Sequence, residues 1–393
     1  MDPVRNPFAP GAGNPPPELA GRADVLSAID VSLQRIAIGR PTQSSILVGL
    51  RGVGKTVLLV RSREMAEKVG YKTLSVEAHE GRTLADLIIP GIQSALYKLS
   101  TIEGAKEYAR RGLRVLKSFA NGLKLTINDI DYGLSISPEQ GAAESGKIEI
   151  DLPNLLLAVG EAARSARSPF AILIDELQYL SQSEFSALIM SIHKITQANL
   201  PVVLIGAGLP QILGLAGESK SYAERLFRYP RIGELTKNDA TTAIVKPVQV
   251  EGSDITQDAV DEILRISERY PYFIQQWAHD SWNMCASGVI TYNDVVAATE
   301  VSISALDDNF FRVRFDRCTP AEKKYMRALA EYGPGSHRSG DIAYTLNVKT
   351  QSVGPVRSSL IKKGMIYSPQ HGDTAFTVPL FDAYMRRVMP DTA

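Results

Sequence analysis

The sequence predicts an α/β fold with a parallel sheet, followed by two units that are mainly helical. Four short runs rich in β-branched residues, at 45–48, 73–76, 171–174 and 202–205, alternate with helical patterns such as 55–69, 84–99 and 184–197. Continuous apolar runs of this length are typical of parallel strands buried on both faces. Their alternation with helices favours an α/β architecture from about residue 19 to residue 235.

The amino-acid composition is that of a globular protein without disulfide bonds. The chain has 393 residues, of which 44% are hydrophobic and 22% charged, which is ordinary for a globular protein of two or three domains. The 43 basic residues equal the 43 acidic ones, so any nucleic-acid contact must come from a local patch. The only cysteines are Cys285 and Cys318, which exclude a disulfide framework and suit a reducing compartment.

No segment has the pattern of a secretory signal or a membrane span. The N-terminus lacks a basic region followed by an apolar one. The most apolar window, 200–217, is interrupted by prolines and glycines, which favours a buried strand and a loop. We therefore expect a cytoplasmic protein that does not contact the membrane.

The element order predicts four parts. Residues 1–18 form an arm rich in proline and glycine, and residues 19–236 form the α/β domain. An insertion at about 104–150 holds a basic amphipathic helix (104–122), a hairpin (123–137) and a polar stretch. Residues 237–304 are predicted to be helical only. Residues 305–393 end in two helices (339–346 and 350–363) and two strands (366–369 and 375–378), the order of a winged helix.

The strongest motif is the run GLRGVGKT from Gly49 to Thr56, which matches G-x-x-x-x-G-K-[ST] between a strand and a helix. Glycines allow successive backbone N–H groups to point at phosphate oxygens, and the following helix adds its positive end. In this motif the lysine reaches the β- and γ-phosphates and the hydroxyl takes a Mg²⁺ position. We expect the nucleotide to contact Gly49, Gly52, Val53, Gly54, Lys55, Thr56 and Val57.

A second motif supplies acids at the end of a buried strand. The apolar run 170–174 is followed by Asp175 and Glu176. Asp175 would hold Mg²⁺ through water, and Glu176 would act as a general base on the attacking water. Strands often end in acidic loops, so this pattern is informative because it accompanies GLRGVGKT. The five histidines are scattered and no G-x-S-x-G occurs, which excludes a zinc helix and a hydrolase triad.

GLRGVGKT, the strand-borne LIDE, the segment Glu18-Leu-Ala-Gly21-Arg22 and the helical region together resemble AAA+ P-loop ATPases. The branch most similar contains the origin-recognition (ORC) and cell-division-cycle initiator ATPases, and the resemblance covers nearly the whole chain except 104–150. It implies ATP with Mg²⁺, a five-stranded sheet with the Walker B and sensor strands beside the P-loop strand, a helical lid (237–304) and a winged helix (305–393). It also implies that Gly21 and Arg22 lie near the adenine.

Three departures from the family pattern affect catalysis. The tip of the strand after Walker B, 204–208, has no polar side chain to orient water. Arg225 is the best-placed arginine finger, with Glu176 and Lys55 as the other catalytic residues, although a solvated helix arginine fits Arg225 equally. The lid has no obvious sensor arginine, but Pro271 in Arg-Tyr-Pro-Tyr resembles the lid proline of signal-transducing switch ATPases. We expect intact nucleotide binding, slow hydrolysis and, if Arg225 acts in trans, nucleotide-dependent self-association.

The C-terminal unit carries a local positive charge. Residues 319–393 hold six acids and ten basic residues, a net charge of +4: Lys323, Lys324, Arg327, Arg338, Lys349, Arg357, Lys362, Lys363, Arg386 and Arg387. Lys349, Gln351, Ser352 and Arg357 would face a DNA groove, with His371 on the wing. One hypothesis is a slow ATPase whose nucleotide state controls a DNA-associated winged helix. The alternative is an ATP switch whose winged helix and insertion bind protein partners.

Overall fold

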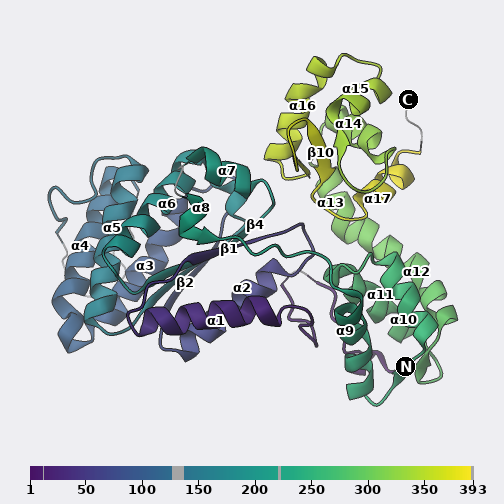
Figure 1. Cartoon of the computed structure of the whole chain (residues 1–393), viewed down its shortest axis with the longest axis horizontal. Helices are drawn as coiled ribbons and strands as arrows, with labels where there is room; N and C mark the ends of the chain where they lie inside the picture. Colours follow the sequence, from purple (N-terminus) through teal and green to yellow (C-terminus); the bar gives the residue numbers. More distant parts are fainter. Residues whose placement is uncertain (12, 126–136, 220–222, 391–393) are drawn as a thin grey trace.

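The computed structural model describes residues 1–11, 13–125, 137–219 and 223–390. A parallel sheet with helices on both faces forms one body, and the helices α9–α12 and the C-terminal unit lie to one side of it (Figure 1). Most of the hairpin predicted at 123–137 falls outside the described residues. Among the described residues, no helix combines the length and the apolarity needed to cross a bilayer.

The central sheet has five parallel strands in the order β2-β3-β4-β1-β5. The four predicted strands are confirmed, and a short fifth strand lies at the edge beside β1. β4 lies between β1 and β3, so the Walker B strand is one strand removed from the P-loop strand rather than adjacent to it. The strands are β1 (Ser44–Val48), β2 (Lys72–Glu77), β3 (Phe170–Asp175), β4 (Val202–Gly208) and β5 (Phe227–Arg228).

The helices cover the two faces of this sheet unequally. α1 (Ala23–Ala37) and α2 (Lys55–Lys68) pack on one face, and the opposite face carries a thicker layer (Figure 1). Every residue of β1, β3 and β4 is buried, as their continuous apolar runs predicted. The thicker layer contains α3 (Leu84–Ser100), α4 (Lys106–Gly122), α5 (Ile148–Ser165), α6 (Gln182–Gln197), α7 (Ile212–Ser219) and α8 (Ala223–Leu226).

The predicted amphipathic helix of the insertion is confirmed as α4, after a 3-10 turn at Glu103–Ala105. It buries Leu113, Leu116 and Phe119 in the same hydrophobic cluster as residues of α3 and α5. In the described part of the insertion, α4 therefore thickens the core rather than forming a separate unit.

The next region is helical but contains two short strands that were not predicted. β6 (Asp254–Ile255) and β7 (Val289–Ile290) pair in parallel. Two residues are too few for a period-two pattern to appear in the sequence. The helices are α9 (Lys237–Val250), α10 (Gln257–Ile266), α11 (Pro271–Met284) and α12 (Tyr292–Leu306).

The expected boundary between residues 304 and 305 lies inside a helical segment. α12 continues through a π-helical turn (Asp307–Phe311) into α13 (Arg312–Phe315). Phe310 and Phe311 on this turn belong to a hydrophobic cluster that joins α9–α12 to the C-terminal unit. The two parts therefore share one core.

The N-terminal arm also joins that cluster. Phe8 is 2% exposed among residues of α9–α12. The indole of Trp282 donates to the carbonyl of Asp2 at 2.9 Å, and Asn6 Nδ2 donates to Asn283 Oδ1 at 2.9 Å. The arm has no core of its own, as expected, but it is packed against the helical region along its length up to Phe8.

The C-terminal unit contains the predicted pair of helices and the predicted hairpin. A third strand, β8, extends the hairpin into an antiparallel sheet of order β8-β10-β9. The elements are α14 (Pro320–Ala330), β8 (His337–Arg338), α15 (Ser339–Thr345), α16 (Thr350–Lys362), β9 (Ile366–Tyr367), β10 (Asp373–Phe376) and α17 (Phe381–Val388).

Candidate functional site

The glycine-rich loop lies between the end of β1 and the start of α2, as its motif requires. Gly54 adopts a left-handed conformation (φ 91°) and caps α2, which begins at Lys55. Among the described residues, the amides of Gly52, Val53 and Gly54 have no hydrogen-bond acceptor. A Cβ on Gly49 would lie 2.1 Å from the carbonyl oxygen of Ile232, so only glycine fits there. The loop therefore presents unpaired N–H groups and a positive helix end to one space.

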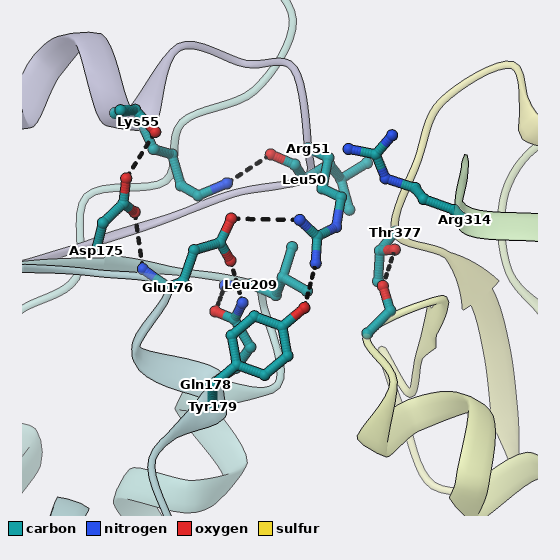
Figure 2. A network of polar contacts seen from close by, with 12 residues as sticks. Leu50, Arg51, Lys55, Asp175, Glu176, Gln178, Tyr179, Leu209, Arg314 and Thr377 are labelled. Carbon is teal, nitrogen blue, oxygen red and sulfur yellow. Dashed lines mark hydrogen bonds and ion pairs between the residues drawn. The ribbon is translucent and has the colours of Figure 1, made fainter. Parts of the chain in front are cut away.

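Lys55 lies at the bottom of the loop and is only 7% exposed. Its ammonium donates to the carbonyl oxygen of Gly49 at 3.0 Å and to that of Leu50 at 2.7 Å, the second of which Figure 2 shows. Burial lowers the pKa of Lys55 to about 8, against the opposing influence of the nearby acids Glu176 and Asp175. The ammonium is thus held by neutral carbonyls only, and an anionic phosphate would be a stronger partner.

Thr56 and Asp175 meet directly. The Thr56 hydroxyl donates to Asp175 Oδ2 at 2.6 Å, and the other carboxylate oxygen accepts from the Glu176 N–H at 2.8 Å. Burial raises the pKa of Asp175, with these two hydrogen bonds acting in the opposite direction. Hydroxyl and carboxylate oxygens are ligands that Mg²⁺ prefers, so the chemistry of this pair fits the predicted metal site.

Glu176 follows β3 in a left-handed conformation (φ 53°), and its carboxylate is held on two sides. Arg51 Nη1 lies 3.3 Å from one oxygen, and Gln178 Nε2 donates to the other (Figure 2). Arg51 also donates to the Tyr179 hydroxyl at 2.9 Å, whereas its buried Nε has no acceptor among the described residues. Sequence reasoning missed Arg51 because it occupies an unspecified position of the motif.

Gln178 supplies the polar group that the tip of β4 lacks. Its Oε1 accepts from the Leu209 N–H at 3.0 Å, so the amide bridges the tip of β4 and Glu176. A Cβ on Gly208 would lie 2.8 Å from that Oε1. The same Cβ would lie 2.0 Å from Ile212 Cδ1, so the glycine at the tip makes room for both Ile212 and the Gln178 amide. The prediction that β4 itself carries no polar side chain at its tip is correct, and Gln178 is the polar side chain that lies beside it.

Residues 51–57 of the loop and Glu176 line one side of a cavity of about 380 Å³, within the roughly 300–1,000 Å³ typical of small-molecule sites. The other side comes from distant segments. The arm contributes residues between Ala9 and Ala20, α11 contributes Pro271 and Tyr272, and the π-helical turn and α13 contribute Asn309, Phe310 and Arg314. Of the predicted residues, Arg22, Gly52, Val53, Gly54, Lys55, Thr56, Val57, Glu176 and Pro271 line the cavity.

Arg22 and Gly21 lie at the edge where the core meets α9. Arg22 is 8% exposed and donates to the carbonyls of Gly233 (2.5 Å) and Val53 (3.3 Å). Burial lowers its pKa despite the nearby Asp239 and Glu234. Gly21 has a positive φ and lies against Asp239, outside the cavity lining. Arg22 therefore holds the backbone of the phosphate-binding loop through the Val53 carbonyl.

Pro271 begins α11, the helix of the predicted lid that contacts the loop. The next residue, Tyr272, donates its N–H to the Gly52 carbonyl at 3.1 Å. The lid and the phosphate-binding loop therefore touch through their backbones.

Arg225 does not line the cavity of its own chain. It lies on α8 with an exposed side chain, and its carbonyl accepts from Gln43 Nε2 at 2.7 Å. A role for this guanidinium would need a second copy of the chain.

Arg357, expected to read DNA, is engaged within its own unit. Its Nε donates to Thr374 Oγ1 at 2.9 Å, and its Nη2 donates to Ser368 Oγ and to the Asp373 carbonyl, both at 2.8 Å. These bonds join α16 to the hairpin. The sequence did not reveal these acceptors on the hairpin, and the expectation that Arg357 faces a groove stays a prediction.

Comparisons with known proteins agree with this architecture. Residues 18–205 match the AAA ATPase domain family, and residues 308–385 match a domain of unknown function. A Walker-type ATPase of Pyrococcus abyssi is similar in structure, with a TM-score of 0.56 and 14% identity over 94% of this chain and 96% of that one. Matches with lower TM-scores are the Aeropyrum pernix ORC1 protein in complex with DNA (0.48, 14% identity, 98% and 96% coverage) and Cdc6p of Pyrobaculum aerophilum (0.47, 14% identity, 99% and 98% coverage).

No curated protein matches the chain in sequence. The family match covers the phosphate-binding loop, the Walker B acids and the strands β1 to β3, and the sheet order is that of a P-loop ATPase core. Residues 18–205 of the chain thus match the AAA ATPase domain family, and the chain has the fold of a P-loop AAA+ core followed by a helical region and a C-terminal unit.

Proposed function

We propose that this protein binds ATP with Mg²⁺ in the cavity between the P-loop and the lid and hydrolyses it slowly. The family implies nucleotide binding. The observation that carries the proposal is the convergence on one cavity of unpaired loop amides, the Lys55 ammonium and Thr56, whose hydroxyl donates to Asp175.

Each group has a distinct role in this proposal. The amides of Gly52 to Val57 and the Lys55 ammonium bind the β- and γ-phosphates. Thr56 and Asp175 would hold Mg²⁺, which neutralises phosphate charge when bound. Arg22, Pro271 and the arm enclose the adenosine end.

Glu176 would polarise the attacking water, and Gln178 would hold the carboxylate in place. The ion pair between Arg51 and Glu176 opposes this role, because it engages the carboxylate oxygen that should accept a proton. Release of this pair before each turnover is a physical reason for slow hydrolysis.

Ligand-dependent stability tests the proposal. ATP with Mg²⁺ should raise the melting temperature of the wild type, because a ligand at about 100 times its Kd adds about 2.7 kcal/mol. Lys55→Ala should abolish the rise, whereas Lys68→Ala, on the exposed end of the same helix, should keep it. A wild-type melting curve that does not change at millimolar ATP would contradict the proposal.

We also propose that nucleotide state acts on the C-terminal unit, which binds duplex DNA as a winged helix. The Arg51 N–H donates to the Thr377 carbonyl at 2.9 Å, so this unit touches the P-loop. The order of α15, α16 and the hairpin supports the winged-helix assignment, and Lys349, Gln351 and Ser352 are exposed at the start of α16.

Several basic side chains of the C-terminal unit are already paired within the protein, so fewer are free to contact DNA phosphates. Arg357 is bound to the hairpin, and ion pairs occupy Lys323, Arg327, Lys363, Arg386 and Arg387. Four basic residues of residues 319–390 remain exposed without a described ion pair: Lys324, Arg338, Lys349 and Lys362. We therefore expect weak binding through two to four phosphates.

Salt dependence tests the DNA proposal on the full chain. Each neutralised phosphate contributes about −0.9 to the slope of log K against log salt, so a slope between roughly −2 and −3.5 is expected. Lys349→Ala should flatten it by about one, and Lys106→Ala, an exposed control on α4, should not. Absence of DNA binding at about 20 mM salt, with and without ATP, would favour the protein-docking alternative.

A further inference from the structure

A second cavity lies at the edge of the sheet opposite the phosphate-binding loop. Its volume is about 350 Å³, close to that of the nucleotide cavity. Its lining includes Thr42, Pro169 and Val202, which lie at or just before the beginnings of β1, β3 and β4. The phosphate-binding loop and Asp175 lie at the other ends of β1 and β3, roughly 15–25 Å away for strands of this length. The two cavities are therefore separate.

Three helix ends with the same backbone geometry form the rim of this cavity. The turns after α1, α5 and α6 each contain one residue in the left-handed conformation, namely Gly39 (φ 78°), Arg167 (φ 49°) and Asn199 (φ 48°). In each turn, the N–H of this residue and the next N–H donate back to carbonyls of the last helical turn, which is the Schellman pattern. These three residues all line the cavity.

The charged side chains of the lining are all basic. Arg40, Arg164 and Arg167 line the cavity, whereas no aspartate or glutamate does. Within the described residues, none of these three guanidiniums forms an ion pair or donates a hydrogen bond. Glu161, which precedes Arg164 by one turn on α5, pairs instead with Arg111 of α4 at 2.8 Å. Helix C-termini favour cations, but they do not supply the counter-charge that three guanidiniums around one cavity attract.

Arg167 occupies a position at which glycine is usual. A left-handed residue after a helix strains a Cβ, so glycine is preferred there and asparagine is tolerated. The turn after α1 has glycine and the turn after α6 has asparagine, but the turn after α5 has arginine. The local backbone gains nothing from this arginine, and its guanidinium adds to the positive charge of the cavity.

The floor of the cavity is apolar. Hydroxyl and amide groups of Thr42 and Asn199 lie among the lining residues between this floor and the arginines. A ligand that fills the cavity must therefore combine an anionic group with an apolar body. The buried apolar residues of the floor are Ile36, Ile195, Leu200 and Val202.

We propose that this cavity binds a small phosphate monoester with an apolar body. Arginine forms paired, charge-assisted hydrogen bonds with phosphate oxygens. A phosphate monoester carries about two negative charges at neutral pH, which suits three guanidiniums better than the single charge of a carboxylate. The apolar body lies over the floor. This inference does not depend on the proposed nucleotide binding, because the two cavities share no residue.

Calorimetry with phenyl phosphate tests this site on the full chain. The Lys55→Ala background is used so that the phosphate-binding loop does not contribute. Phenyl phosphate should bind with a measurable Kd. Inorganic phosphate lacks the apolar body and benzoate lacks the second charge, so each should bind about tenfold more weakly or worse.

The substitution Arg167→Gly separates ligand binding from folding. It should weaken phenyl phosphate about 10- to 100-fold, because it removes one charge-assisted contact. It should not lower the melting temperature, because glycine suits the left-handed position. Asn347→Gly is the matched control, since Asn347 (φ 52°) holds the same position in the turn after α15 and lies outside the cavity. This control should leave the Kd unchanged.

Three results would overturn the proposed site. Phenyl phosphate may fail to bind at millimolar concentration, or benzoate may bind as tightly as phenyl phosphate. The third is an Arg167→Gly variant that binds phenyl phosphate as tightly as its background or no more weakly than the Asn347→Gly control. None of these results bears on nucleotide binding at the phosphate-binding loop.

Discussion

The two walls of the nucleotide cavity are built in different ways. The core wall consists of seven consecutive residues from Arg51 to Val57, together with Glu176 at the end of β3. The opposite wall combines the arm, α11, the π-helical turn and α13, which are separated by some three hundred residues along the chain. The groups that would bind the phosphates thus come from one local motif. The groups on the opposite wall come from distant segments, which connect the cavity to the rest of the protein.

The packing behind the two walls differs as well. The core wall is attached to a sheet that is buried on both faces between two helical layers. The opposite wall belongs to a single hydrophobic cluster that includes Phe8 of the arm, residues of α9–α12 and residues of the C-terminal unit. We expect the segments of the opposite wall to fold and unfold together as one cooperative unit.

The largest effect should come from Phe311→Ala. Phe311 is 1% exposed and contacts Phe273 of α11 and Phe381 and Tyr384 of α17. The change should cost about 3–5 kcal/mol, because it leaves a cavity in the shared cluster. Hydrogen exchange should show that α9–α12 and α14–α17 lose protection together while the sheet keeps its own.

A matched control removes a phenylalanine from the other region. Phe119→Ala in α4 should cost a similar amount but reduce protection in α3, α4 and α5. If Phe311→Ala unprotects the C-terminal unit alone, the second wall is not one cooperative unit.

The next effect concerns the core wall and the rate of hydrolysis. Gln178→Ala removes the amide that connects Leu209 and Glu176, so turnover should fall on the order of 100-fold while the Kd for ATP changes little. Steady-state kinetics and a binding titration measure the two quantities separately. Gln182→Ala, an exposed glutamine at the start of α6, is the control. Faster turnover in Gln178→Ala would show that this amide restrains Glu176 instead.

The smallest effect is a pH dependence of the C-terminal unit. Burial alone would raise the pKa of Glu322, but hydrogen bonds from Lys363, Ser359 and Thr319 outweigh it and lower the pKa to about 2. A depressed carboxyl pKa stabilises the fold above the ordinary value of 4.5. This contribution is lost as the pH falls from there toward 2, at a cost of roughly 2 kcal/mol.

Urea unfolding followed in the C-terminal unit at pH 6 and pH 3 measures this loss. Glu322→Gln should be less stable at pH 6 and should flatten the pH dependence. Glu300→Gln, which alters an exposed acid of α12, should keep the wild-type profile. A wild-type profile that is flat between pH 6 and pH 3 would contradict this role of Glu322.

Sequence reasoning recovered the parts of the fold whose signals are local. Buried parallel strands appear as continuous apolar runs, so β1 to β4 were predicted with near-correct bounds. The 104–122 helix was predicted from its amphipathic pattern. The two-residue strands β6 and β7 and the helix that continues through residue 304 were missed, because neither leaves a periodic signal or a break at those positions.

The same division holds within the site. The sequence alone determined the phosphate-binding loop, Lys55, Thr56 and the acids Asp175 and Glu176, because strand, loop and helix follow one another and the motif is contiguous. Only the tertiary structure decided that Gln178 bridges Leu209 and Glu176, that Arg51 pairs with Glu176, that Arg357 is bound to the hairpin and that Arg314 lines the cavity. The partners of these side chains lie on other elements, and packing alone brings them together.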